Sequence, residues 1–221
     1  MVTKTLTPTL VSDDEVIVET IPMSYDEYQD WYDRGSGRRG EWVDGEVIPF
    51  MSTSTRHAEL VAFLIHLIRS YFETRPIGRV FPQDVELRTR QGSAREPDLQ
   101  VVLREHADRI EEMRVRGAAD LVVEIISRDS VTRDRQVKFD EYEAAGVPEY
   151  WIIEPRAGRE AIDLFVLGDN GQYDAVEPTV DGRLASTVLP GLWLEAAWLT
   201  AEEFPPAGRL GTQMAEAAEG R

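Results

Sequence analysis

The stretch SAREPDLQVVL, residues 93–103, poses the main question of the sequence. Residues 99–103 form a short, largely apolar run, which predicts a buried β-strand. Asp98 stands directly before that run, and a carboxylate in such a place is costly unless something pairs with it. We therefore expect Asp98 to have either a structural partner that offsets this cost or a functional role.

A second acid lies in a similar setting further along the chain. The run DLVVEIIS, residues 120–127, is almost continuously apolar, as expected for a strand covered on both faces, and Glu124 interrupts it. If the two strands are neighbours, the carboxylates of Asp98 and Glu124 converge, and such hard oxygen ligands suit Mg²⁺ or Mn²⁺. That ion would polarise a phosphoryl oxygen and activate a water. The alternative is that an arginine or a helix N-terminus satisfies each acid.

The helix predicted over RDRQVKFDEYEAAG, residues 133–146, carries one of only two lysines in a chain that has 22 arginines. Lys138 shares a helical face with Tyr142 at i+4, and it follows the second acidic strand, so its ammonium can lean back over the strand end. There it would orient a water and stabilise the charge that develops on a phosphate. The alternative is an exposed lysine paired with Asp134 at i−4.

The remaining patterns place these residues in a mixed α/β fold. Asp44-Gly45 between two short alternating arms predicts a hairpin, and residues 54–75 carry apolar side chains at helical spacing. Further expected elements are a helix over residues 24–35, strands over 80–89 and 149–155, and a β-rich closing section over 161–198. This order predicts one mixed central sheet flanked by helices and not a regular doubly wound fold.

Composition restricts the possible functions. The chain has 221 residues without cysteine, which excludes disulfides and thiolate metal sites, and no apolar run reaches the length of a membrane span. Its formal net charge of −17 argues against bulk affinity for nucleic acid or anionic membranes, but it leaves room for a small basic groove. The N-terminus does not resemble a signal peptide, so we expect a cytoplasmic protein. We expect a flexible arm over residues 1–20, one domain over 21–204 and a disordered tail over 205–221.

Two long segments resemble the Uma2 family, formerly a domain of unknown function. They are EPDLQVVL, residues 96–103, and LVVEIISRDSVTRDRQVKFDEYEAAGVPEYWIIEP, residues 121–155; GEWVDGEVIPFMSTSTRHAEL, residues 40–60, is also similar. The resemblance covers about residues 22–200. The family belongs to the PD-(D/E)XK nuclease superfamily. The resemblance implies a restriction-endonuclease-like α/β fold, with a mixed central sheet flanked by helices and an additional β-rich C-terminal section.

The superfamily motif places a lysine two residues after the second acid, whereas this chain has Ile126 there. The resemblance therefore implies that the lysine has moved to the next helix, as Lys138. Asp98 and Glu124 are then catalytic residues and ligands of Mg²⁺ or Mn²⁺. Arg128 is a rival for the place of the amine, although a guanidinium hardly loses a proton at working pH.

Three further side chains are accessory candidates for this site: Glu41, His57 and Tyr142. Glu41 precedes the hairpin, and acids of the N-terminal region often complete sites in this superfamily; a surface acid is the alternative. His57 opens the long helix, where it either touches a phosphate or a water or is merely solvated. We also expect a phosphate-binding rim of local arginines: Arg88, Arg90, Arg95, Arg128, Arg133 and Arg135.

Two functions from different classes remain open. The first is a metal-dependent endonuclease that hydrolyses phosphodiester bonds of nucleic acid, with DNA as the expected substrate, bound weakly or locally. The second is a catalytically silent nuclease-fold module that binds or regulates. The net charge of −17 favours the second, and the retained acids and lysine oppose it. Nucleases of this fold are frequently dimeric, so we expect a homodimer; LWLEAAWL, residues 192–199, is either part of an interface or ordinary core.

Overall fold

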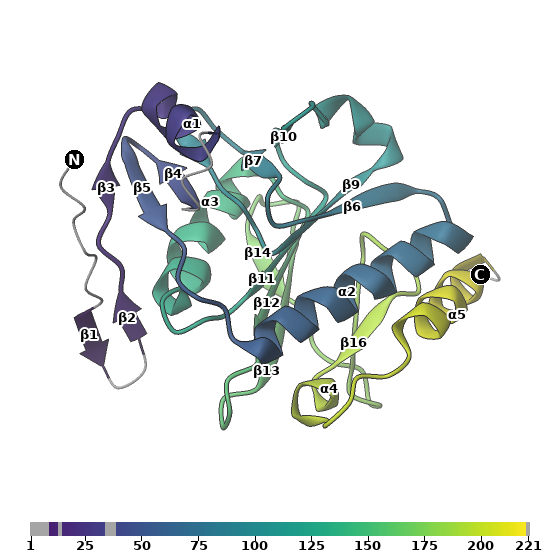
Figure 1. Cartoon of the computed structure of the whole chain (residues 1–221). Helices are drawn as coiled ribbons and strands as arrows, with labels where there is room; N and C mark the ends of the chain where they lie inside the picture. Colours follow the sequence, from purple (N-terminus) through teal and green to yellow (C-terminus); the bar gives the residue numbers. More distant parts are fainter. Residues whose placement is uncertain (1–8, 13–14, 34–38, 220–221) are drawn as a thin grey trace.

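The computed structural model describes residues 9–12, 15–33 and 39–219 (Figure 1). Its helices are α1 (Tyr25–Asp33), α2 (Thr55–Thr74), the 3₁₀ helix η1 (Arg104–Arg109), the π-helical turn η2 (Arg133–Val137), α3 (Lys138–Ala145), α4 (Ala197–Thr200) and α5 (Ala207–Glu219). Its strands are β1 (Thr9–Ser12), β2 (Glu15–Ile17), β3 (Ile21–Pro22), β4 (Gly40–Val43), β5 (Glu46–Pro49), β6 (Gly78–Pro82), β7 (Glu86–Arg88), β8 (Ser93–Ala94), β9 (Leu99–Leu103), β10 (Arg114–Arg116), β11 (Leu121–Ile125), β12 (Glu149–Glu154), β13 (Ala161–Leu167), β14 (Tyr173–Ala175), β15 (Arg183–Ala185) and β16 (Trp193–Glu195).

The central element is a mixed six-stranded sheet with the order β14-β13-β12-β11-β9-β6. β11 and β12 run parallel, with α3 in the connection between them, and the other neighbours in this sheet run antiparallel. The fold class predicted from the sequence, a mixed sheet flanked by helices with extra strands near the C-terminus, is confirmed. The two acidic segments are therefore direct neighbours in the sheet.

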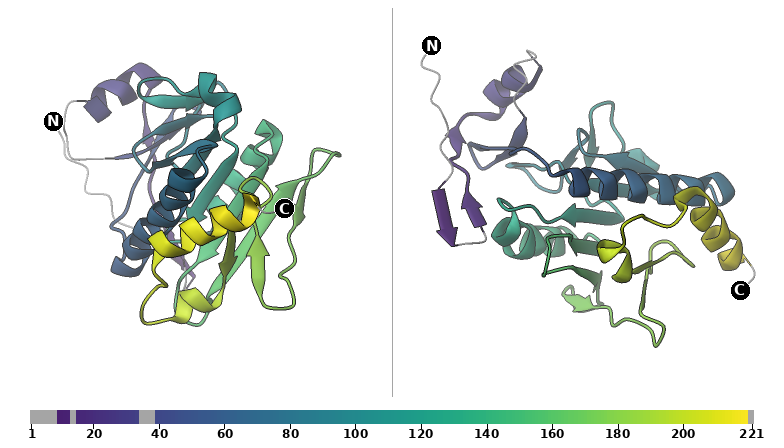
Figure 2. Two further views of the ribbon diagram at one scale, coloured as in Figure 1. Left: turned by 90° about the vertical axis from the view of Figure 1, so that its right-hand side faces the viewer. Right: turned by 60° about the horizontal axis from the view of Figure 1, so that its bottom comes forward.

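The two faces of this sheet carry separate cores because side chains alternate along each strand. On one face, Val123 and Ile125 of β11 pack with α2 and α5, which lie side by side (Figure 2). On the other face, Val122 packs with Tyr142 of α3. Glu124 has the same parity as Val122, so it points toward α3.

A smaller sheet with the order β3-β5-β4-β8 stands beside the main one, together with α1. Its hairpin turns at Asp44-Gly45, where both residues have positive φ, 49° and 94°. That combination is the one a two-residue hairpin turn requires, so the predicted hairpin is confirmed. The hairpin positions Glu41 on β4, on the side of the small sheet that meets the main sheet.

Three expectations about the elements need comment. Residues 80–89 do not form one strand, because Asp84 adopts a φ of 93° and separates β6 from β7, which belong to different sheets. The tail prediction is wrong: α5 occupies most of residues 205–221 and buries Met214 and Ala215 against the core. The predicted flexible arm lies partly outside the described residues, and β1 and β2 within it form an antiparallel pair.

The aromatic segment over residues 192–199 belongs to the core. Leu192, Leu194 and Leu199 are buried, and the two tryptophans of the segment pack against the same cluster. Among the described helices, none combines the length and the apolar character that crossing a membrane requires.

Candidate functional site

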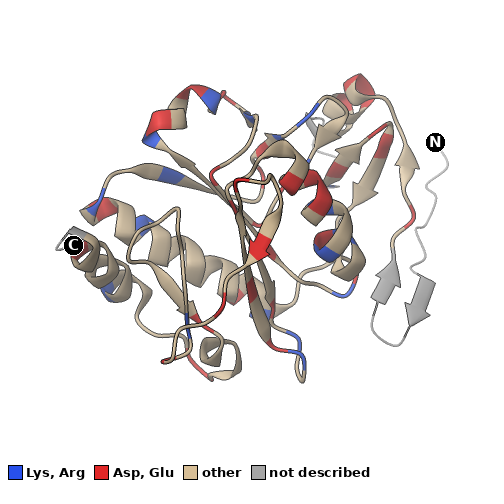
Figure 3. Ribbon diagram, turned by 180° about the vertical axis from the view of Figure 1, so that it is seen from behind, with Lys and Arg blue, Asp and Glu red and all other residues tan. Residues whose placement is uncertain are grey.

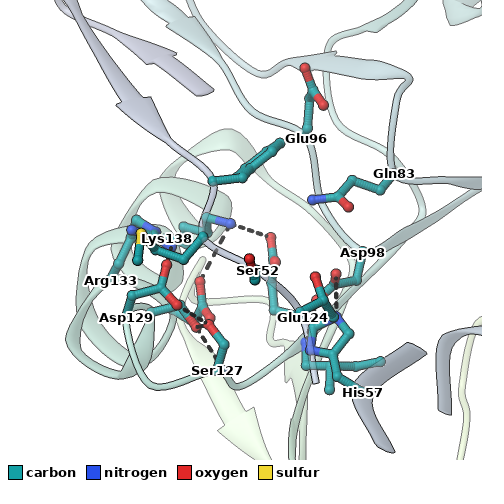
Figure 4. Close-up of a pocket in the computed structure, with 16 residues that line it drawn as sticks. Ser52, His57, Gln83, Glu96, Asp98, Glu124, Ser127, Asp129, Arg133 and Lys138 are labelled. Carbon is teal, nitrogen blue, oxygen red and sulfur yellow. Dashed lines mark hydrogen bonds and ion pairs between the residues drawn. The ribbon is translucent and has the colours of Figure 1, made fainter. Parts of the chain in front are cut away.

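A small pocket lies where the ends of β9 and β11 meet the start of α3 (Figure 4). β9 and β11 are antiparallel, with Leu99 opposite Val123, so the next residue pair along this register is Asp98 and Glu124. Both acids line the pocket, together with His57 and Lys138. Its volume of about 70 Å³ admits a cation with some of its water but not a nucleotide base.

Asp98 is held in a defined orientation by both of its oxygens. Oδ1 lies 2.9 Å from Nε2 of His57, and Oδ2 accepts a hydrogen bond of 2.7 Å from the backbone N–H of Ile125. His57 sits in the first turn of α2, where its backbone N–H donates to the capping side chain of Ser54. The long helix therefore positions a ring nitrogen against the first acid of the site.

Glu124 is bound by two side chains of the following helix. Lys138 Nζ lies 2.8 Å from Glu124 Oε1, and the Tyr142 hydroxyl donates to the same oxygen at 3.0 Å. Lys138 and Tyr142 are both buried, and they reach Glu124 from one helical face because they are four residues apart. The helix thus carries the amine to the strand that holds the second acid.

The ammonium of Lys138 also binds an acid of the small sheet. Its Nζ lies 2.8 Å from Glu41 Oε1 and 3.4 Å from Asp134 Oδ1. Glu41 is 1% exposed, so its alternative as a surface acid is wrong. Lys138 is not an exposed lysine paired with Asp134 either, because it is 3% exposed and Asp134 is the most distant of its three carboxylates.

The surrounding charges give these groups different pKa values. Burial alone would raise the pKa of Glu41, but Lys138, Arg95 and Arg133 lower it to about 2. Burial raises the pKa of Glu124; Lys138 opposes this, but the carboxylates of Asp134, Asp98 and Glu41 add to it, so its pKa stays well above the usual range. We infer that any proton taken up by the cluster resides on the Glu124 side and not on Glu41, which has three cations nearby.

Lys138 is a fixed cation at working pH. Burial alone would lower its pKa, but the carboxylates of Glu124, Glu41 and Asp134 raise it above the usual value. The lysine can therefore donate hydrogen bonds and balance negative charge, but it is not a proton acceptor in this state.

Sequence reasoning considered Asp134 only as the partner of an exposed lysine and Arg95 only as part of a rim, so it missed the place of each in the buried cluster. Arg95 is 1% exposed and bridges Glu41, at 3.1 Å, and Glu141 of α3, at 2.7 Å. It was expected in a phosphate-binding rim, but its guanidinium is enclosed by protein. Its neighbours come from distant parts of the chain, so no local pattern could have identified them.

Most of the expected arginine rim pairs with carboxylates instead of facing an open site. The pairs are Arg88 with Glu86, Arg90 with Asp44, Arg95 with Glu41 and Glu141, Arg133 with Asp129, and Arg135 with Asp163. Arg133 lines the pocket, and Arg128 is exposed beside it. The rim prediction is wrong for Arg88, Arg90, Arg95 and Arg135, which pair with carboxylates and do not line the pocket, whereas Arg133 does line it.

The pocket suits a hard divalent cation that the protein coordinates only in part, so that water or substrate completes the coordination shell. Among the described residues, no group of three or more His, Asp or Glu side chains is arranged to hold a metal. Mg²⁺, however, keeps several waters and needs only one or two carboxylates beside substrate phosphates. Lys138 and Tyr142 both bind Oε1 of Glu124, and no hydrogen bond from the described residues reaches Oε2. Asp98 and Glu124 would hold the ion.

Comparisons with known proteins bear on the family and on the fold. A family model called Uma2, with the description "Putative restriction endonuclease", matches residues 25–198. A similar solved structure is described as a "putative nuclease belonging to DUF820" from Anabaena variabilis ATCC 29413. It is 17% identical, covers 88% of this chain and 99% of its own, and superposes with a TM-score of 0.61. No curated protein matches the chain.

Proposed function

This chain belongs to the Uma2 family, and from that premise we propose that it is a metal-dependent endonuclease that hydrolyses phosphodiester bonds of nucleic acid, with DNA as its substrate. The observation that carries the proposal is the convergence of three groups in one pocket. Asp98 and Glu124 come from neighbouring strands, and the ammonium of Lys138 lies 2.8 Å from Glu124. This set combines two acids for a cation with one amine for a phosphate or a water.

Each side chain has a distinct part in the proposed reaction. A divalent cation bound by the acids supplies Lewis-acid activation of the phosphoryl group and of a water. Asp98 contributes a carboxylate whose direction His57 and a backbone N–H set. Lys138 keeps its proton, so it orients the attacking water by donating a hydrogen bond and offsets charge on the phosphate.

Glu41 and Tyr142 act on Lys138 and Glu124 rather than on the substrate. Glu41, on the small sheet, holds the ammonium at the same distance, 2.8 Å, as Glu124 does. The hydroxyl of Tyr142 donates a hydrogen bond to Oε1 of Glu124, which fixes the carboxylate and leaves Oε2 for the cation. These two are positioning residues, because neither lines the pocket.

The test is cleavage of single- and double-stranded DNA and RNA with Mg²⁺, with Mn²⁺ and with EDTA. We expect cleavage that requires the metal and is lost in Asp98→Asn and Glu124→Gln. Asp174→Asn on β14 is the matched control, since it removes the same charge at an exposed position away from the pocket. Metal-independent cleavage, or activity that survives both pocket substitutions, would refute the assigned site. Binding of nucleic acid without cleavage under every condition would instead support the silent module.

A further inference from the structure

A second cavity, of about 730 Å³, opens directly beside the candidate pocket. The two cavities share a wall made of Met51, Ser52, Ser127 and Asp129. A ligand that presents one group to the small pocket can therefore extend the rest of its structure into the larger cavity. The larger one lies between the start of α2, the segment after β11 and the turn that joins β12 to β13. We call it the arginine groove.

The lining of the arginine groove is mainly basic, whereas the molecule as a whole is acidic. Its lining contains four arginines, Arg56, Arg128, Arg156 and Arg159, and one carboxylate, Asp129. The chain as a whole has a formal net charge of −17. Figure 3 shows basic residues in the turn between β12 and β13 within a molecule where acidic residues are widespread. Such a cluster attracts an anion locally although the whole protein repels it.

The four arginines are not equivalent. Arg56 donates to the backbone carbonyl of Trp198 at 2.9 Å and stacks on the ring of Phe204, so it has a structural role. Arg156 forms a two-point contact with Glu154, at 2.8 and 2.7 Å. Arg128 is exposed and forms no ion pair or hydrogen bond with the described residues, and Arg159 is exposed in the β12–β13 turn. Arg128 and Arg159 are the two exposed arginines among these four, so their side chains are the best placed to reach a ligand.

The rest of the lining indicates which part of a nucleic acid the groove binds. Among the described residues that line it, none is aromatic, so it offers no platform on which a base stacks. Arginines matched to phosphate oxygens, with the serines of the shared wall, suit the sugar–phosphate backbone. The start of α2, at Thr55, adds the positive end of a helix dipole next to Ser54 and Arg56.

We propose that the arginine groove binds the backbone of the nucleic-acid strand next to the phosphate in the pocket, through Arg128 and Arg159 and without reading base sequence. The inference rests on the proposed function, since it assigns the path of the same substrate. This assignment explains how an acidic chain binds a polyanion, because the electrostatic attraction is confined to one groove. Binding is then weak, strongly dependent on salt and indifferent to sequence.

The experiment measures binding of a fluorescein-labelled DNA duplex by anisotropy, over a series of salt concentrations, with EDTA present to prevent cleavage. The variant is Arg128→Gln/Arg159→Gln. Loss of two phosphate contacts should reduce the slope of log K against log salt by about 1.8 and weaken binding roughly tenfold. The loss should be the same for duplexes of unrelated sequence.

The matched control is Arg79→Gln/Arg104→Gln, which removes the same charge from two exposed arginines that do not line the groove, one on the edge strand β6 and one on η1. The control should keep wild-type affinity and slope. An equal loss in both variants, an unchanged slope in the groove variant, or a loss confined to one base sequence would overturn the inference. Displacement of the duplex by low concentrations of inorganic phosphate would also overturn it, by identifying a site for a single anion.

The two proposals fail in distinguishable ways. If the wild-type protein binds and cuts DNA while the groove variant keeps its affinity and slope, the groove assignment is wrong and the proposed function stands. If the wild-type protein neither binds nor cuts any nucleic acid offered, with either metal, the proposed function is wrong and the assignment of the groove falls with it.

Discussion

The substitution Lys138→Met tests the electrostatic arrangement of the site directly. Lys138 is 3% exposed, and its ammonium lies 2.8 Å from Glu41 and from Glu124, and 3.4 Å from Asp134. Methionine approximates the shape of lysine but leaves the buried carboxylates without their shared cation. Breaking a buried ion pair by removing one partner costs about 3–5 kcal/mol. An exposed pair contributes only about 0–1 kcal/mol, so the two situations are separable by experiment.

The loss of stability in Lys138→Met should increase as the pH rises. Burial, with the neighbouring carboxylates, already holds the pKa of Glu124 well above its ordinary value of 4.5 against the opposing effect of Lys138, and removing Lys138 raises it further. A carboxyl with a raised folded-state pKa binds more protons in the native than in the unfolded state. Stability therefore falls as pH rises from the ordinary value through the folded-state pKa, by up to about 1.4 kcal/mol per unit for each proton. The variant should be closest to wild type at mildly acidic pH.

The assay is urea denaturation followed by tryptophan fluorescence, in EDTA, at mildly acidic and mildly alkaline pH. We expect the free energy of unfolding to fall by about 3–5 kcal/mol at alkaline pH and by less at acidic pH. The double variant Lys138→Met/Glu124→Gln should recover part of the loss, because a neutral amide needs no cation. A loss below about 1 kcal/mol, or one that neither pH nor Glu124→Gln changes, would refute the reasoning.

Three further outcomes are expected. His57→Ala removes the contact of 2.9 Å to Asp98, so metal-dependent cleavage should fall by roughly tenfold or more; an unchanged rate would deny His57 a positioning role. Mn²⁺ at about 100 times its Kd should raise the free energy of unfolding of the wild type by about 2.7 kcal/mol in thermal unfolding, but should not stabilise Asp98→Asn. An equal increase in both proteins would mean that the ion binds elsewhere. Gly211→Ala should cost about 1–3 kcal/mol, because the added Cβ would overlap a backbone oxygen of α2. Gly208→Ala, where the added Cβ meets side-chain atoms of His66 and Ser70 and no backbone, is its control, and equal stability of the two variants would contradict the expected close packing of α5.

The family and the fold class were predictable because they rest on local patterns. The resemblance to Uma2 is confirmed by the family model, and the mixed sheet is present. Asp44-Gly45 forms the expected turn, and α3 stops before Gly146, which adopts the left-handed conformation at its C-terminus. The turn and the helix end depend on residues that are close together in the sequence, and β9, β11 and β12 were each recognised from a local apolar run.

The features that could not be predicted depend on distant partners. The composition of residues 207–219 is typical of a frayed tail, yet packing against α2 holds them in a helix. Lys138 has an obvious local partner in Asp134, but its shorter contacts are with Glu41 and Glu124, which no helical periodicity relates to it. The arginine groove joins three separate segments, so its arginines were not recognised as a set.

The ammonium of Lys138 connects two sheets that the chain builds at different times. Glu41 belongs to the small sheet, which is synthesised early, whereas Glu124 and Lys138 follow much later. Until α3 has been made and has docked, the early acid lacks the amine beside it and the pocket lacks one wall. A chain that ends before α3 therefore has no assembled site, so on the proposed function the ability to cut would arise only after α3 has docked.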